Sequence, residues 1–306
     1  MNTASKNRPV VFLFGPTGVG KTQLLSEAFG EGYEVVVADS IQVYRGLDIG
    51  SAKPDQRERL NPPHHLIDIR DPSEPFDVGD FVSAADRAVD EILARGKVPV
   101  LSGGSAYYFV NFLFGLPTTP AAQPQVRVQS KTEWEQLGEP EFRRRLAAVD
   151  PVAEARIKPH DAYRLQRAWE VWLQTGRPLS SFERSGTPRE GLQVRLFGLD
   201  RPRGDLYQRI DQRVGAMMGA GLEDEVRGLL ARGFGAQSPG MKGIGYAEFL
   251  PWLLEGKGDL ASVTFAIAQH SRNYAKRQLT FFRSLPGVEW YHPDQHRDLL
   301  NALKRH

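Results

Sequence analysis

Three short apolar runs in the first third of the chain predict buried β-strands. Each run holds four or five residues, is rich in valine or phenylalanine, and is followed at once by glycine, aspartate or serine. Such runs are typical of strands that are buried on both faces of a parallel sheet. The runs are residues 10–14, 34–38 and 98–101.

Segments with a helical spacing of apolar residues alternate with these runs. Strand and helix patterns that alternate along a chain predict an α/β fold with a doubly wound parallel sheet. Ligands of such sheets bind at the carboxyl ends of the strands, where Gly15, Asp39 and Gly103 fall in this sequence. The helical segments are residues 21–29, 81–93 and 107–114.

The pattern changes in the middle of the chain. Prolines at positions 117, 120 and 124 mark a linker, and the spacing from residue 126 to residue 172 is helical. Strand-like sequence resumes at residues 194–199. We therefore predict a helical insertion domain, residues 121–190, inside one core domain made of residues 1–120 and 191–306.

Helical patterns dominate the last third of the chain. One amphipathic helix is predicted from residue 206 through residue 230, and another over residues 260–283. On the second helix, Arg272, Lys276 and Arg283 share one face, because offsets of four and seven residues point the same way. A final short strand is predicted at residues 288–291.

Composition and charge narrow the classes of protein that fit. The chain has 306 residues, of which 41% are hydrophobic and 25% charged, an ordinary globular composition. Its 39 basic and 37 acidic residues leave a net charge of +2, which excludes a polybasic protein. Nucleic-acid binding stays open, because basic residues concentrate between residues 143 and 167. The chain has no cysteine, which excludes disulfides and thiolate chemistry.

The hydropathy of the chain argues against a membrane protein. No apolar run approaches the roughly 18 residues that a membrane span requires. The polar residues 1–9 lack the apolar centre of a signal peptide. We therefore expect a cytoplasmic protein without a membrane partner.

A phosphate-binding motif follows the first strand. Residues 15–22 match the pattern G-x-x-x-x-G-K-[ST] between a strand and a helix, as a P-loop requires. Backbone N–H groups of the loop converge on phosphate oxygens, Lys21 adds a positive charge, and Thr22 is placed to bind Mg²⁺. The motif predicts a P-loop NTPase-like core that binds a di- or triphosphate, with ATP or GTP the first guess on frequency alone. Its residues are Gly15, Pro16, Thr17, Gly18, Val19, Gly20, Lys21 and Thr22.

The position of the nearest carboxylate is unusual for a hydrolytic ATPase. The strand at 98–101 ends in Ser102 and glycines with no acidic residue, whereas Asp39 follows the second strand. Asp39 is therefore expected at the mouth of the sheet, where it could act as a general base on an acceptor. The alternative is that Asp39 caps the next turn. Both interpretations stay open on the sequence.

Several blocks of the sequence resemble the bacterial tRNA dimethylallyltransferases, also called tRNA isopentenyltransferases. The resemblance implies transfer of the dimethylallyl group from dimethylallyl diphosphate to N6 of the adenosine that is 3′-adjacent to the tRNA anticodon. The product would be N6-dimethylallyladenosine in tRNAs that read codons starting with U. Beside the P-loop, the blocks are residues 39–54, 63–68, 102–105, 164–168, 243–246 and 274–280.

The resemblance also implies roles for residues. The P-loop would hold the diphosphate of the allylic donor, and Asp39, Ser105 and Arg213 would be catalytic. The implied partners are dimethylallyl diphosphate and a tRNA anticodon stem-loop, with Mg²⁺ as cofactor and a monomeric enzyme. The implied tRNA contacts are Asp39, Ser40, Ile41, Gln42, Ser105, Arg127, Tyr163, Arg164, Leu165, Gln166, Arg167, Lys242, Gly243, Ile244, Gly245, Tyr246, Lys276, Arg277, Gln278 and Arg283.

The sequence departs from the family pattern at a few positions. The P-loop has Gly18-Val19 where the family more often has Ala-Ser, Ser105 stands for a usual threonine, and Tyr163 for a common glutamine.

Three other functions share the P-loop: an isopentenyltransferase for free adenine nucleotides, a small-molecule kinase, and a non-enzymatic RNA-binding protein that uses a nucleotide as a switch. The pair His64-His65 is interpreted as structural, because no carboxylate spacing supports a metal site.

Overall fold

The computed structural model describes residues 8–182 and 186–304 and contains one six-stranded sheet. The strand order is β3-β2-β4-β1-β5-β6, and all neighbouring strands are parallel. The predicted α/β fold with a parallel sheet is therefore confirmed. The strands are β1 (Arg8–Phe14), β2 (Tyr33–Ala38), β3 (His64–His65), β4 (Val98–Gly103), β5 (Leu192–Leu199) and β6 (Glu289–Tyr291).

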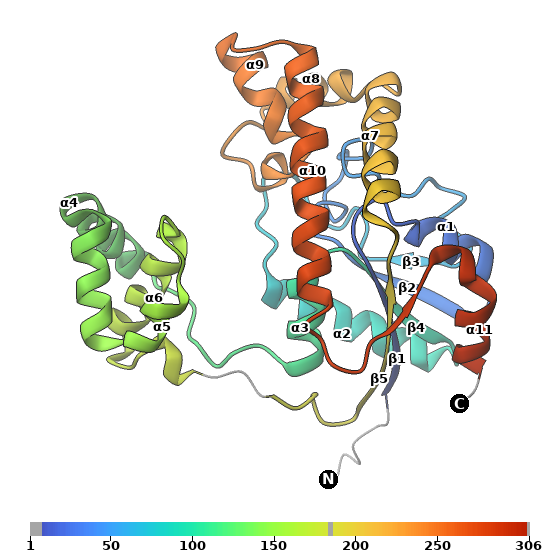
Figure 1. The fold of residues 1–306 in the computed structure, drawn as a ribbon, viewed down its shortest axis with the longest axis horizontal. Helices are drawn as coiled ribbons and strands as arrows, with labels where there is room; N and C mark the ends of the chain where they lie inside the picture. Colours follow the sequence, from blue (N-terminus) through green and yellow to red (C-terminus); the bar gives the residue numbers. More distant parts are fainter. Residues whose placement is uncertain (1–7, 183–185, 305–306) are drawn as a thin grey trace. The chain divides into compact units, whose positions relative to one another are not determined.

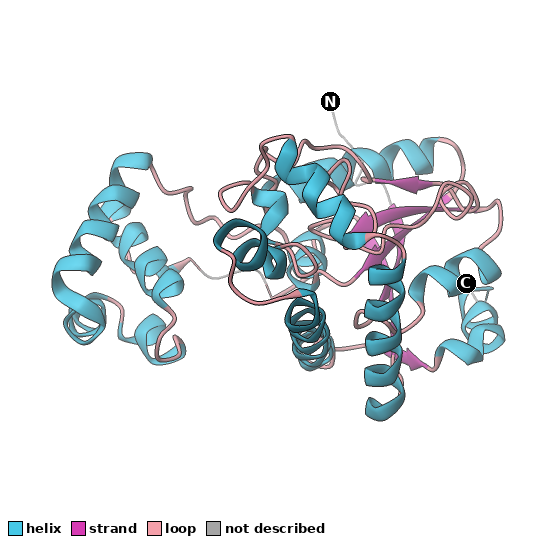
Figure 2. Ribbon diagram, turned by 90° about the horizontal axis from the view of Figure 1, so that it is seen from above, coloured by secondary structure: helices cyan, strands magenta, loops and turns pink. Residues whose placement is uncertain are grey.

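Helices cover both faces of the sheet (Figures 1 and 2). Because side chains alternate along a strand, Val11 and Leu13 of β1 face one side and Phe12 and Phe14 the other. The first side packs on α1, α7 and α11, and the second on α2, α3 and the end of α10. The helices of the part of the chain that contains the sheet are α1 (Lys21–Ala28), α2 (Val78–Ala94), α3 (Ala106–Phe114), α7 (Arg203–Gly219), α8 (Leu222–Ala231), α9 (Leu250–Glu255), α10 (Leu260–Phe282) and α11 (His296–Lys304).

A stacked aromatic pair fixes α10 on the sheet. The rings of Phe14 and Phe282 lie 4.4 Å apart between centroids, and both side chains are fully buried. Phe109 of α3 packs edge-on against both rings. Since Phe14 directly precedes the P-loop, this contact holds the C-terminal half of α10 close to the loop.

The chain divides into two compact units, Met1–Leu113 with Arg189–His306, and Phe114–Pro188. The second unit is helical, and its core is built around the contacts of Phe142 with Trp134 and Trp169. Its longest helix is kinked, because Gly138 adopts a left-handed φ of 68°. Its helices are α4 (Pro124–Val149), α5 (Pro151–Arg156) and α6 (Ala162–Thr175).

The helix that was predicted from residue 206 through residue 230 is wrong as a single element. It is two helices, α7 and α8, which pack against each other. Gly221 lies between them with φ +94°, a left-handed conformation that ends one helix and starts the next in a new direction. The first turn of α8 carries Glu223, Asp224 and Glu225, as expected of a helix N-terminus.

Among residues 8–182 and 186–304, no helix is both long enough and apolar enough to pass through a bilayer. Most of the polar N-terminal segment on which the signal-peptide argument depends, residues 1–7, lies outside the described residues.

Candidate active site

Three loops meet at one edge of the sheet. Gly103 at the end of β4 is in register with Phe14 of β1 and with Ala38 of β2. The P-loop, Asp39 and the loop after β4 therefore leave the sheet side by side, and they line a hollow of about 480 Å³. The register of β1, β2 and β4 therefore brings Gly15, Asp39 and Gly103 together, as predicted.

The P-loop has the backbone that its glycines permit. Gly18 and Gly20 adopt left-handed φ angles of 81° and 109°, which a larger residue would adopt only under strain. A Cβ on Gly15 would lie 2.7 Å from the carbonyl oxygen of Leu199, so only glycine fits. The loop therefore leads directly into α1 at Lys21, with its amide groups around the hollow.

Lys21 is folded back onto the loop. Its Nζ donates to the carbonyl oxygens of Gly15, at 2.8 Å, and Pro16, at 2.9 Å. Loss of hydration on burial lowers the pKa of Lys21 to about 7; the nearby charge of Arg213 lowers it further, and Asp39 opposes the shift.

Arg213 is the second cation of the hollow. Its Nη2 donates to Thr17 Oγ1 at 2.6 Å, while its Nε is buried with no hydrogen-bond partner among the described residues. Burial lowers the pKa of Arg213, and the charge of Asp39 opposes that effect. Within the described chain, neither Lys21 nor Arg213 forms an ion pair with a carboxylate, so both positive charges are available to an anion.

One face of α7 lines the first hollow. Arg209, Gln212, Arg213 and Ala216 follow one another at helical spacing and all line the hollow. Arg209 also donates from Nε to the Gly18 carbonyl at 3.1 Å. Arg209 and Gln212 were not among the predicted site residues, although their spacing from Arg213 is a signal that could have identified them.

Asp39 caps the following turn, and this cap leaves one of its carboxylate oxygens open to the hollow. Its Oδ1 accepts hydrogen bonds from the backbone N–H groups of Ile41, at 2.8 Å, and Gln42, at 3.2 Å, so it caps the following turn. No described residue donates a hydrogen bond to its Oδ2. Asp39 also lines the hollow next to Lys21 and Arg213, and the cap fixes the direction of a carboxylate whose second oxygen is open.

A second hollow of about 320 Å³ adjoins the first. The two share Thr17, Asp39, Ser51, Arg213 and Tyr274 as lining residues, so Asp39 stands where they meet. The other walls bring together predicted tRNA contacts from three distant parts of the sequence. These are Ser40, Ile41, Lys242, Gly243, Ile244 and Arg277.

α10, which packs against α7, also contributes residues to the site. Gln278 accepts from Thr17 N at 2.9 Å and donates to the Gly104 carbonyl at 2.7 Å, so one buried amide ties the P-loop to the loop after β4. Ser105 is buried beside it, and its Oγ accepts from Ser40 N at 3.2 Å. Tyr274, which was not predicted as a site residue, interacts with Ser105 and Gln278, and burial raises its pKa to about 12.

Other predicted contacts are not among the residues that line the two hollows. Leu165 belongs to the core of the insertion and Tyr246 to the core of the other unit, so neither side chain faces solvent. Arg283 pairs with Asp200. The insertion places Arg127, Tyr163 and Arg164 on its surface, where Arg164 pairs with Asp161, whereas Gln166 and Arg167 are half-buried.

The basic face predicted on α10 is only partly correct. Arg272 pairs with Asp211 and Arg283 with Asp200, so two of its three charges are neutralised by other elements. Lys276 is exposed and makes no ion pair with any residue that the structure describes. The free positive charge of this helix therefore lies at Lys276 and Arg277.

Each histidine of the pair contacts an oxygen atom of the core unit. His65 Nε2 contacts Glu34 Oε2 at 2.7 Å, and His64 Nδ1 contacts the Pro62 carbonyl at 2.7 Å. Over the described ranges there is no group of three or more histidine or acidic side chains that could hold a metal ion.

Comparison with protein families gives two matches. Residues 42–285 match the family described as IPP transferase, and residues 8–72 match isopentenyl transferase. The tRNA dimethylallyltransferase of Borrelia turicatae is 39% identical over 300 residues, which cover 97% of this chain and 99% of that one. The tRNA dimethylallyltransferase 1 of Trichlorobacter lovleyi is 44% identical over 286 residues, 92% of each chain.

Solved structures show the same fold. The full-length tRNA isopentenylpyrophosphate transferase from Bacillus halodurans superposes with a TM-score of 0.70 at 34% identity, covering 97% of this chain and 95% of that one. A eukaryotic dimethylallyltransferase, studied acting on tRNA, superposes with a TM-score of 0.77 at 26% identity and covers 97% of this chain and 77% of its own.

Proposed function

The chain belongs to the tRNA dimethylallyltransferase family, and from that premise we propose that it transfers a dimethylallyl group from dimethylallyl diphosphate to N6 of the adenosine 3′-adjacent to the tRNA anticodon. The product is N6-dimethylallyladenosine in tRNAs that read codons starting with U. The observation that supports this most is a pair of cations, Lys21 and Arg213, which form no ion pair with a described carboxylate and lie beside Asp39 at the junction of two hollows.

The first hollow suits the diphosphate of the donor. In the transfer, the bond between C1 of the dimethylallyl group and the diphosphate oxygen breaks, and the diphosphate leaves with the electron pair. Negative charge develops on the leaving oxygen, and fixed positive groups that point at it lower the barrier. Lys21, Arg213 and the loop N–H groups supply that charge, and Thr17 holds Arg213 in place.

The second hollow suits the acceptor adenosine. A base in the anticodon loop has to leave its stack before N6 can reach a donor, and a pocket then receives it. As N6 bonds to C1 it must lose a proton, and the open Oδ2 of Asp39 stands between the two hollows to accept it. Tyr274 lines both hollows, and Ser105 interacts with it. Both residues bring a neutral hydroxyl group to this place.

The donor atoms at the P-loop fit a Mg²⁺ ion. Mg²⁺ in phosphate sites takes one or two protein oxygens and completes its shell with phosphate and water. Thr22 lines the first hollow, so its hydroxyl oxygen would hold the ion together with the diphosphate. When bound, the ion neutralises charge on the departing diphosphate.

The tRNA itself needs a wider surface. Arg127 and Tyr163 of the insertion are exposed, as are Lys242, Lys276 and Arg277 of the core unit. Cations neutralise the RNA backbone, and an exposed tyrosine provides a stacking face for an unpaired base. We assign these five side chains to tRNA binding.

One transfer assay tests the proposal against its alternatives. Purified protein with Mg²⁺ and labelled dimethylallyl diphosphate is offered an anticodon stem-loop, the same stem-loop with guanosine at the target position, or AMP. We expect label only in the first acceptor. Label in AMP would indicate a nucleotide isopentenyltransferase, and label in none of them would leave the kinase or the nucleotide switch, which ATP-binding measurements then distinguish.

A further inference from the structure

Residues 42–54 form a wall that the two hollows share. Gln42, Ser51, Ala52 and Pro54 line the first hollow, and Gly50 and Ser51 line the second. Ala52 has φ +49°, a left-handed conformation that is unfavourable for any residue with a Cβ. Such a backbone persists only where its surroundings hold it in place. The contacts that hold this wall therefore decide the shape of the donor hollow.

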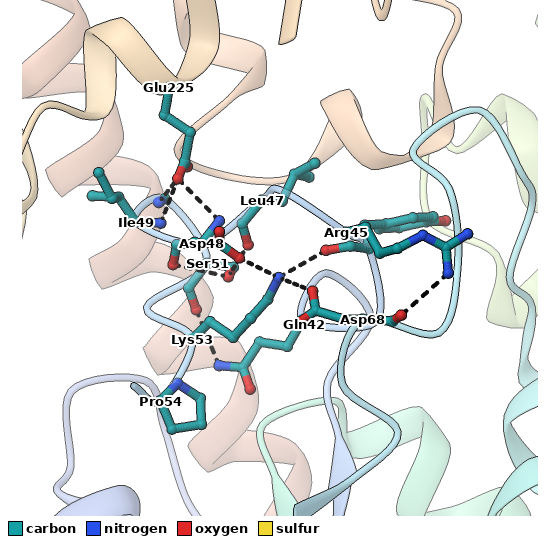
Figure 3. A network of polar contacts seen from close by, with 12 residues as sticks. Gln42, Arg45, Leu47, Asp48, Ile49, Ser51, Lys53, Pro54, Asp68 and Glu225 are labelled. Atoms are coloured by element: carbon teal, nitrogen blue, oxygen red, sulfur yellow. Dashed lines mark hydrogen bonds and ion pairs between the residues drawn. The ribbon is translucent and has the colours of Figure 1, made fainter. Parts of the chain in front are cut away.

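Glu225, in the first turn of α8, is the first of these contacts (Figure 3). Its Oε2 accepts from the N–H groups of Asp48, at 3.1 Å, and Ile49, at 2.8 Å. Its Oε1 accepts from Gly50 N at 3.1 Å and from the Tyr246 hydroxyl at 2.7 Å. Four donors converge on one carboxylate, which accepts only; an amide at this position would place two N–H donors against other donors.

Tyr246 is the second contact. Its ring is fully buried, and its hydroxyl accepts from Ser51 N at 3.1 Å while it donates to Glu225. A Cβ on Gly50 would lie 2.6 Å from this ring, and a Cβ on Gly245 would lie 2.9 Å from the Gly50 carbonyl oxygen. The backbone at residue 50 is therefore packed directly on Tyr246, which leaves no space for the wall to move back.

The far end of the wall is fixed by a buried lysine, which Figure 3 places at the centre of the network. The side chain of Lys53 is fully buried, and its Nζ donates to Asp48 Oδ1 at 2.6 Å, Asp68 Oδ1 at 2.7 Å and the Tyr44 carbonyl at 2.8 Å. Gln42 Nε2 donates to the carbonyls of Ser51 and Ala52 and so holds the strained residue from the inside.

We propose that Glu225, acting through Tyr246 and the backbone of residues 48–51, is a positioning residue that sets the shape of the donor hollow and thereby which allylic diphosphates it accepts. The inference rests on the proposed function, because it names what that hollow selects. Neither side chain lines either hollow, so their effect on the substrate passes through the wall.

The test compares Glu225→Gln and Tyr246→Phe with the wild-type protein. The matched control is Glu223→Gln, two residues away on α8, whose carboxylate pairs with Arg227 and does not contact the wall. For Glu225→Gln we expect the KM for dimethylallyl diphosphate to rise about tenfold, as hydrogen bonds to a charged acceptor are lost. The preference for dimethylallyl over geranyl diphosphate should fall by about the same factor, since both reflect the position of the wall.

The variants should separate positioning from simple stabilisation. Tyr246→Phe should act in the same direction by about threefold, because it removes one neutral hydroxyl from the network. The KM for the stem-loop should rise as well, because Gly50 and Ser51 also line the second hollow, whereas the constants of Glu223→Gln should stay at wild-type values. If Glu225→Gln lowers only the Tm, while the folded enzyme keeps its donor KM and its preference between donors, the proposal is overturned. A changed stem-loop KM with an unchanged donor KM would overturn it as well.

The assay also distinguishes this inference from the proposed function. If the wild-type protein forms no prenylated product, the proposed function fails. The affinity for inorganic pyrophosphate, measured by calorimetry, then replaces the donor KM. Weaker binding by Glu225→Gln than by Glu223→Gln would support a positioned hollow, and equal binding would reject it.

Discussion

The two units of the chain use positive charge in opposite ways. In the insertion, Arg143 pairs with Glu139 and Glu154, and Arg144 pairs with Glu141. In the core unit, Lys21 and Arg213 are recessed in a hollow and pair with no carboxylate of the described chain. The insertion has the higher density of basic residues in the sequence. The two recessed cations that pair with no described carboxylate, however, belong to the core unit.

This difference shows why charge density along a sequence is a poor guide to an anion site. A surface arginine that has a carboxylate neighbour three or four residues away gains a modest local contact and has little left for a ligand. A cation that loses water without gaining a counter-ion is destabilised, and its pKa falls, as it does at Lys21. A bound diphosphate removes that penalty, so the destabilised cations indicate the site.

The largest effect should come from removing the cations of the hollow. Lys21→Ala should lower kcat/KM for dimethylallyl diphosphate by roughly 10³-fold, because charge that develops on the leaving diphosphate loses its nearest partner. Steady-state rates on the anticodon stem-loop measure this change. The matched control is Arg144→Ala in the insertion, which should leave kcat/KM within about twofold. Equal losses in the two variants would remove the distinction between the units.

Asp39→Asn comes next in size. Asparagine keeps an acceptor oxygen for the N–H groups of Ile41 and Gln42, so the capped turn survives while the proton acceptor is lost. The expected outcome is a kcat lower by roughly 10²-fold with an unchanged Kd for the stem-loop. Single-turnover rates at saturating RNA, together with a binding titration, separate the two quantities. A weaker Kd with normal turnover of the bound RNA would make Asp39 a recognition residue.

Much of the core unit could be predicted because its signals are local. The buried strands are contiguous apolar runs, and the P-loop is a contiguous motif between a strand and a helix, so neither depends on distant residues. The meeting of Gly15, Asp39 and Gly103 follows from the rule that parallel strands present their carboxyl ends at one edge. Arg213 came from resemblance, and its helical spacing could have added Arg209 and Gln212.

The errors are of two kinds: a helix break inside a continuous apolar pattern, and residues whose partners are far away in the sequence. The apolar pattern continues across Gly221, so it cannot show that a left-handed glycine divides the helix there. Arg272 and Arg283 share a face of α10, but the acids that neutralise them, Asp211 and Asp200, belong to other elements. For the same reason, no local pattern could show that Tyr246 is a buried support.

A pH series tests the contrast between the paired cations of the insertion and the unpaired Lys21 of the core unit. Because the pKa of Lys21 is lowered from 10.5 to about 7, the free enzyme loses this charge as the pH rises above 7. A bound anion favours the protonated form, so binding takes up a proton, and the Kd for inorganic pyrophosphate should rise by up to about tenfold per pH unit above 7. Calorimetric titrations from pH 6.5 to about pH 9 follow this change.

Lys21→Arg is the control for that pH series, since a guanidinium stays charged throughout the range. Any pH dependence that remains in this variant belongs to the titration of pyrophosphate itself. Subtracting it leaves the contribution of Lys21. Identical slopes for the two proteins would show that Lys21 remains charged without a ligand, and would contradict the contrast between paired and unpaired cations.

The smallest effect is expected from the one arginine among the predicted insertion contacts that has no ion-pair partner in the described part of the chain. Arg127 is exposed and unpaired, whereas Arg144 is exposed and paired with Glu141. Arg127→Ala should weaken binding of whole tRNA about threefold and reduce the slope of log K against log salt by about one, because one phosphate contact is lost. Filter binding between about 50 and 200 mM salt measures both quantities. Arg144→Ala should change neither; if it weakens binding as much as Arg127→Ala, then pairing with a carboxylate does not withdraw a surface arginine from RNA.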